Sequence, residues 1–191
     1  MTPDLATAAP TYRIHRYPSA LIDRLMLADG RTITLRPVLP QDAEAEQAFV
    51  AGLSPEARRL RFHLAVNALP DALLRRFTEI DYRSHLALIA EALDDDGEPC
   101  IVADARYAVD AGADHGDFAI AVADDWQGLG LGRALMQRLA RQARRSGLAA
   151  LSGDVLSDNQ AMQGLVQRLG GRLEPHPEEA GLLRAQFDLR A

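Results

Sequence analysis

The chain of 191 residues contains no lysine, because all 21 of its basic residues are arginines. A lysine amine is the group that forms a Schiff base, completes a phosphate-binding P-loop or becomes acylated on an enzyme itself. All three uses of lysine are therefore excluded. The single cysteine, Cys100, excludes an internal disulfide and argues against a cysteine-based metal site. The five histidines include no pair at metal-ligand spacing, so we expect no metal.

Basic charge and long apolar runs are also scarce. The 27 acidic residues outnumber the arginines, which gives a formal net charge of -6 and argues against a nucleic-acid or anionic-membrane partner. No apolar run approaches the roughly 20 residues of a membrane span. The N-terminus lacks the basic and apolar regions of an export signal, so the expected location is cytoplasmic.

A chain of this length is long enough for one well-buried core and short for two. We predict a flexible lead-in over residues 1–18, which prolines interrupt, followed by a single domain over residues 19–191. The hydrophobic pattern predicts a strand, several helices, a strand pair, a strand-turn-helix unit, and a final strand-helix-strand unit. This order predicts an α/β (α+β) fold, in which helices flank a mixed sheet with antiparallel early strands.

The stretch from Gly116 to Ser146 is the most informative part of the sequence. It begins as a short apolar strand after Asp117, continues into a turn with glycine at every second position, and ends as an amphipathic helix. Leucines and alanine at four-residue spacing mark the buried face of that helix. Glycines at the open N-terminus of a helix let backbone N–H groups approach an anion, above all a phosphate.

Three kinds of glycine-rich phosphate loop can be compared with this turn. A P-loop requires lysine and fails. The dinucleotide-binding fingerprint G-x-G-x-x-G/A fits in neither possible alignment. One alignment requires glycine where the chain has Arg133, and the other requires glycine or alanine where it has Leu135. Asp154, after the next strand, is placed as a ribose-binding acid of that fingerprint would be. The remaining pattern is Gln/Arg-x-x-Gly-x-Gly/Ala, where x is any residue. Gln127, Gly130 and Gly132 fit it.

This last pattern resembles the coenzyme A pyrophosphate loop of the GCN5-related N-acetyltransferases (GNAT). The likeness extends over most of the chain and is greatest to the acetyltransferase domain that ends bacterial protein lysine acetyltransferases. Further matching segments, in the order of that family, are Leu35-Arg36-Pro37-Val38, Arg59-x-Arg61-Phe62, Asp117-Phe118-Ala119 and Asp158-Asn159-x-x-Met162. The resemblance implies the GNAT fold, with a mostly antiparallel sheet and one splayed parallel strand pair.

The resemblance also implies acetyl-CoA as cosubstrate and a primary amine as acceptor. The acceptor expected from it is a protein lysine, for example on an acyl-CoA synthetase, and a small-molecule amine is the alternative. Backbone groups of two strand residues would hold the pantetheine arm, the glycine loop would bind the pyrophosphate, and an asparagine would contact the coenzyme further along. The residues at these positions are Ile120, Val122, Gln127, Gly128, Gly130, Gly132, Arg133 and Asn159.

Direct transfer needs a base for the amine and a proton for the leaving thiolate. Asp117 is the candidate base, one methylene shorter than the glutamate usual in the family, and Glu91 is the second candidate. Where many relatives have a tyrosine as acid, this chain has Val166, which leaves Ser157, Tyr82 or a water. These departures keep a non-catalytic acyl-CoA-binding module open as an alternative. The sequence does not indicate an oligomeric state.

Overall fold

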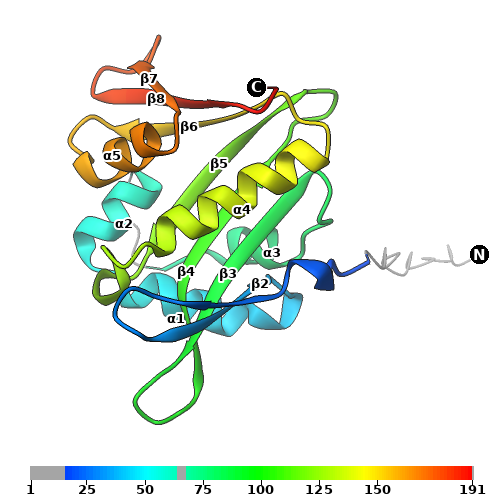
Figure 1. Cartoon of the computed structure of the whole chain (residues 1–191), viewed down its shortest axis with the longest axis vertical. Helices are drawn as coiled ribbons and strands as arrows, with labels where there is room; N and C mark the ends of the chain where they lie inside the picture. The colour runs from blue at the N-terminus through cyan, green and yellow to red at the C-terminus, as the bar shows by residue number, and fades with distance from the viewer. Residues whose placement is uncertain (1–15, 64–67, 191) are drawn as a thin grey trace, which may run out of the picture.

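The computed structural model describes residues 16–63 and 68–190. Eight strands form one sheet in the order β1-β2-β3-β4-β5-β6-β8-β7 (Figure 1). All neighbouring strands are antiparallel except β5 and β6, which are parallel, so the predicted mixed sheet is confirmed. The strands are β1 (Asp23–Met26), β2 (Thr32–Pro37), β3 (His85–Leu93), β4 (Pro99–Ala108), β5 (His115–Val122), β6 (Ala150–Leu156), β7 (Arg172–Pro175) and β8 (Leu182–Asp188).

Helices cover both faces of this sheet. The α-helices are α1 (Ala43–Gly52), α2 (Pro55–Phe62), α3 (Asp71–Thr78), α4 (Leu131–Arg145) and α5 (Gln160–Arg168). Short 3-10 helices are η1 (Ser19–Leu21), η2 (Pro40–Asp42) and η3 (Asp124–Trp126). Figure 1 shows α4 lying along one face of the sheet, with α1 and α3 on the opposite face. Within the described ranges, no helix is long and apolar enough to cross a membrane.

The core consists of two apolar layers because the central strands are buried on both faces. Leu86 and Leu88 of β3 point to the α4 side, whereas Ala87 and Ile89 point to the α1 side, as the period-two geometry of a strand requires. The predicted apolar face of α4 is confirmed. Its residues Leu131, Leu135, Leu139 and Ala143 are at most 1% exposed.

Local signals also locate most element ends correctly. Ser54 caps α2 by accepting the Ala57 N–H at 3.1 Å, and Asn159 caps α5 by accepting the Met162 N–H at 3.0 Å. Gly147 follows α4 with φ of 84°. Strand β7 was not predicted, because its four residues are mostly exposed and it depends on pairing with β8.

Most of the predicted lead-in lies outside the described residues, which begin at Arg16. Tyr17 is within them. Its hydroxyl donates to the Pro37 carbonyl oxygen at 3.0 Å, and its ring meets the Tyr82 ring edge-on with centroids 5.7 Å apart. Tyr17 therefore packs against the end of β2.

A buried ion network fastens the helices of one face to the sheet. Arg106 of β4, 5% exposed, donates to Asp104 at 2.6 and 2.9 Å, to Glu46 of α1 at 3.0 Å and to the Phe77 carbonyl oxygen of α3 at 3.1 Å. Arg61 of α2 adds a second guanidinium, with Nη2 3.9 Å from Asp104 Oδ1. Burial, reinforced by the nearby Asp104 charge, raises the pKa of Glu46 to about 8.

This raised pKa predicts a pH-dependent stability that Glu46→Gln removes. Between the ordinary glutamate pKa of 4.5 and about 8, the folded protein holds a proton that the unfolded chain has released. The wild-type free energy of unfolding should therefore fall as pH rises through this interval. Its fall should be roughly 1 kcal/mol or more larger than the fall measured for Glu46→Gln. Urea unfolding at several pH values measures the difference.

Glu44→Gln is the matched control, because Glu44 is exposed on the same helix. It should retain the wild-type pH dependence. Parallel curves for wild type and Glu46→Gln would contradict the assignment.

Candidate active site

The two parallel strands β5 and β6 separate after three paired positions. The pairs are His115 with Ala150, Gly116 with Leu151 and Asp117 with Ser152. Beyond them β5 remains paired with β4 as far as Val122, and β6 remains paired with β8. The strand edges that face each other across the gap are thus left with backbone N–H and C=O groups that have no partner in a β-ladder.

A glycine and an aromatic ring form the base of this gap. A Cβ on Gly153 would lie 2.8 Å from the Phe118 carbonyl oxygen and 2.9 Å from its ring, closer than any side chain can approach. The Phe118 ring is 7% exposed and packs against Phe187, with centroids 5.6 Å apart. The strands therefore touch at Phe118 and Gly153 and diverge beyond them.

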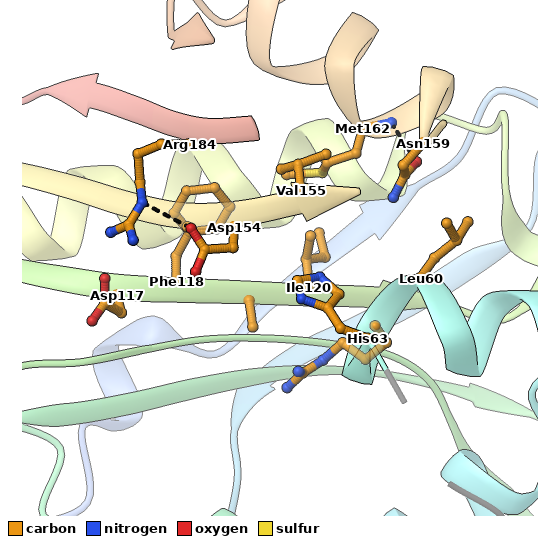
Figure 2. A pocket seen from close by; sticks show the side chains of 13 residues that line it. Leu60, His63, Asp117, Phe118, Ile120, Asp154, Val155, Asn159, Met162 and Arg184 are labelled. Atoms are coloured by element: carbon orange, nitrogen blue, oxygen red, sulfur yellow. Dashed lines mark hydrogen bonds and ion pairs between the residues drawn. The ribbon is translucent and has the colours of Figure 1, made fainter. Parts of the chain in front are cut away.

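Two cavities occupy the region between the separated strands, α2 and α5. The first, of about 340 Å³, is called here the cleft cavity and extends toward Asp117, Asp154 and Arg184 (Figure 2). The second, of about 540 Å³, is called the loop cavity and extends along Val122 to the glycine turn. Both are lined by Leu60, Arg61, Ile120, Asn159 and Met162. Because they share these residues, the two cavities form one continuous site.

The loop cavity ends at the N-terminus of α4. Gly128 and Gly130 have φ of 75° and 88°, a backbone conformation that favours glycine. Gly130 starts α4 without a side-chain cap, so the first N–H groups of the helix are open to a ligand. Arg133 and Arg168 also line this cavity. This combination of helix N-terminus and arginines suits a phosphate group.

The Asp124 side chain, just before the turn, binds the residue that caps α2. The Asp124 carboxylate accepts the N–H and hydroxyl of Ser54 at 3.0 and 2.7 Å, and these bonds hold the pKa of Asp124 below its usual range. The Arg31 guanidinium stacks 3.8 Å from the Trp126 ring centroid and donates to the Asp125 carbonyl oxygen at 2.9 Å.

Comparison with known proteins gives the same result as this geometry. The family model "Acetyltransferase (GNAT) family" matches residues 55–171. The chain belongs to the GNAT acetyltransferase family. It is an acetyl-CoA-dependent N-acetyltransferase. The predicted GNAT fold, the acetyltransferase class and acetyl-CoA as cosubstrate are confirmed.

Two acetyltransferases and one solved domain illustrate the similarity. Acetyltransferase PA5475 of Pseudomonas aeruginosa is 36% identical over 151 residues, which are 78% of this chain and 81% of that protein. Acetyltransferase Pat of Mycolicibacterium smegmatis is 34% identical over 142 residues, 74% of this chain but only 41% of Pat. The crystal structure of the GNAT domain of S. lividans PAT matches with a TM-score of 0.81 at 29% identity, and covers 91% of this chain and 99% of that domain.

The GNAT site brings together the residues predicted to bind the coenzyme. Ile120, Val122, Asn159 and the whole predicted set of the glycine turn, Gln127, Gly128, Gly130, Gly132 and Arg133, line the loop cavity. Gln127 also donates from its side-chain amide to the Val122 carbonyl oxygen at 3.0 Å, which closes the turn onto β5. These positions fit a ligand with a phosphate end and a long polar arm.

The two predicted catalytic carboxylates lie in different surroundings. Asp117 is exposed, lines the cleft cavity and accepts the Ser152 hydroxyl on Oδ1 at 2.8 Å. Glu91 lies on β3, where Arg36 donates to its Oε2 at 2.7 Å and also binds Asp42 at 2.7 and 2.9 Å. Glu91 is not among the described residues that line either cavity.

The candidate acids are also placed away from the cavities. The Tyr82 hydroxyl donates to the Val38 carbonyl oxygen at 2.8 Å, and neither Tyr82 nor Ser157 is among the described lining residues. His85 starts β3, and burial lowers its pKa to about 4. Within the described lining of both cavities there is no tyrosine, serine or cysteine.

Several residues of the site carried no sequence signal of their own. Leu60 of α2 lines both cavities, and Arg168 of α5 lines the loop cavity. Arg184 reaches the cleft cavity from β8. Helical spacing could have placed Arg168 beside Leu165, but β8 can be assigned to this site only once its pairing with β6 is known.

The contact between β5 and β6 generates a prediction for Gly153→Ala. The added methyl group cannot fit against the Phe118 backbone and ring, so the variant should lose about 1–3 kcal/mol of unfolding free energy. Gly52→Ala is the control, because a Cβ there meets nothing within 4 Å. Thermal and urea unfolding measure both. Equal stability of the two variants would show that the strands are not held this closely.

Proposed function

We propose that the enzyme transfers the acetyl group directly to the side-chain amine of a protein lysine, with Asp117 as the base. The observation that carries this proposal is the position of Asp117. It is the last residue of β5 paired with β6, at the point where the strands part, and it lines the cavity that joins the coenzyme loop. An amine entering the cleft cavity would meet this carboxylate on its way to the residues that both cavities share.

The surroundings of Asp117 suit a proton acceptor. The Ser152 hydroxyl fixes one carboxylate oxygen, and Oδ2 has no partner among the described residues. Because Asp117 is exposed, a water molecule has access to Oδ2. Asp117 can therefore take the ammonium proton directly or through one water, which would compensate for the shorter side chain.

The remaining residues position the donor. Acetyl-CoA supplies the thioester carbonyl that the amine attacks. The backbone edge of β5 at Ile120 and Val122, which does not pair with β6, would hold its arm, and the open N-terminus of α4 with Arg133 and Arg168 would bind its phosphates. Asn159 uses its side-chain oxygen as a helix cap, which leaves its amide N–H groups for the ligand.

A protein lysine is supported by charge. The cleft cavity presents the carboxylates of Asp117 and Asp154 beside Arg61 and Arg184, and the net charge of -6 favours a basic acceptor. An acyl-CoA synthetase remains the expected protein partner, because the sequence resembles the domain of bacterial protein lysine acetyltransferases. The cytoplasmic location stays a prediction.

The base assignment predicts opposite results for two substitutions at Asp117. Asp117→Asn should lower the rate of amine-dependent CoA release roughly a hundredfold or more, because it removes the proton acceptor. Its affinity for CoA should not change. Asp117→Glu should retain activity, since it restores the carboxylate with one more methylene.

Glu91→Gln tests the second candidate in the same assay. Measured at a temperature where both proteins are folded, it should keep the wild-type rate because Glu91 is bound to Arg36 outside the cavities. A full rate for Asp117→Asn together with a collapsed rate for Glu91→Gln would reverse the assignment.

The acceptor proposal predicts labelled lysines in other proteins. A bacterial proteome incubated with the enzyme and isotopically labelled acetyl-CoA should show labelled lysine side chains by mass spectrometry, which the Asp117→Asn variant does not produce. The enzyme has no lysine, so any labelled side-chain amine belongs to a substrate. Transfer to small amines alone would refute the protein acceptor. Tight CoA binding with no transfer to either would indicate a regulatory module.

A further inference from the structure

A second carboxylate lines the cleft cavity opposite Asp117. Asp154 lies on β6, two residues beyond Ser152, the last residue of β6 paired with β5. Figure 2 shows Asp117 and Asp154 on the two strands that border the cavity. Asp154 is absent from the described lining of the loop cavity, which contains the cationic groups suited to phosphate. It therefore lies on the acceptor side of the site.

One oxygen of Asp154 is anchored and the other is free. Arg184 Nε lies 2.8 Å from Oδ1, and His176 Nε2 lies 3.6 Å from the same oxygen. The N–H groups of Glu178 and Glu179 donate to His176 Nδ1 at 3.3 and 3.0 Å and fix the imidazole ring. Oδ2 of Asp154 has no partner among the described residues, and Figure 2 shows the second oxygen pointing toward β5.

We propose that Asp154 is the residue that recognises the protonated amine of the acceptor, before Asp117 removes its proton. This inference rests on the proposed transfer to a primary amine. An ammonium group has three N–H donors, and the free oxygens of Asp117 and Asp154 offer it acceptors from both walls of the cavity. Arg184 acts as a positioning residue, because its guanidinium holds the carboxylate through the other oxygen. His176 Nε2 in turn lies 3.0 Å from Arg184 Nη2.

The anchoring groups give the two carboxylates different tasks. Asp117 is bound by a neutral hydroxyl through one oxygen, which leaves the carboxylate suited to accept a proton. Asp154 is bound by a guanidinium, which orients it without reaching across the cavity. Recognition by Asp154 would select acceptors that carry a positive charge and discriminate less among neutral nucleophiles.

The test compares a charged with an uncharged acceptor. For Asp154→Asn, the KM for Nα-acetyl-lysine amide should rise about tenfold, corresponding to the loss of one charge-assisted hydrogen bond, with little change in kcat. The KM for hydroxylamine, which is uncharged at the assay pH, and the KM for acetyl-CoA should stay at the wild-type values. Asp154→Glu should recover most of the affinity for the lysine amide.

Asp188→Asn is the matched control, because it removes the same charge from an exposed position at the far end of β8. It should behave as wild type with both acceptors. An equal rise of KM for hydroxylamine and the lysine amide in Asp154→Asn, or a parallel loss of thermal stability and acetyl-CoA affinity, would overturn the recognition role.

A binding measurement separates this inference from the proposed function. Calorimetric titration of Nα-acetyl-lysine amide into the CoA-bound protein needs no turnover, and Asp154→Asn should weaken binding about tenfold. Unchanged binding, or no binding to wild type, would overturn the inference. Wild-type protein that binds CoA and the lysine amide but transfers no acetyl group would instead refute the proposed function and leave the recognition site standing.

Discussion

The separation of β5 and β6 is the constraint on which the site depends. After Asp117 and Ser152 the two strands stop pairing, yet each stays in the sheet through its other neighbour. The gap therefore forms without loss of the sheet's continuity, and it exposes polar backbone edges that a long, extended ligand can satisfy. The gap begins next to Gly153, where the lack of a side chain lets the backbone of β6 approach Phe118.

This gap also determines which side chains meet. α2 and α5 lie over it, joined by the ion pair of Arg59 with Asp158 at 2.8 Å, and they supply the residues shared by both cavities. α2 is held in turn by Asp124 at its N-terminus and by the buried network of Arg106 near its C-terminus, where Arg61 lies. The helix that closes the site is thus fixed at both ends by interactions with the strand and the loop that it covers.

Local features of the sequence were sufficient to predict the elements that carry the proposed coenzyme residues. The glycine turn, the α4 face and the Asn159 cap each depend on residues within a few positions of one another, so their geometry follows from spacing. The acceptor side depends on pairs distant in sequence. Arg184 reaches Asp154 because β8 pairs with β6, and Arg106 reaches Glu46 across 60 positions. No periodicity encodes these contacts.

The absence of tyrosine, serine and cysteine from the described lining of the cavities has a simple chemical resolution. A protonated primary amine loses two protons in the reaction. The first leaves before the nitrogen attacks, and the second leaves when the amide forms. Asp117 can take the first. The second leaves the nitrogen as the carbon–sulfur bond breaks, next to the thiolate that requires it, so the acceptor itself can protonate its leaving group. Val166 is fully buried and carries no proton donor at the position where many relatives have a tyrosine. Proton transfer from the acceptor nitrogen to the thiolate therefore requires that the amine stay close to the thioester throughout. Firm positioning of the ammonium from both strands then becomes part of the catalytic requirement.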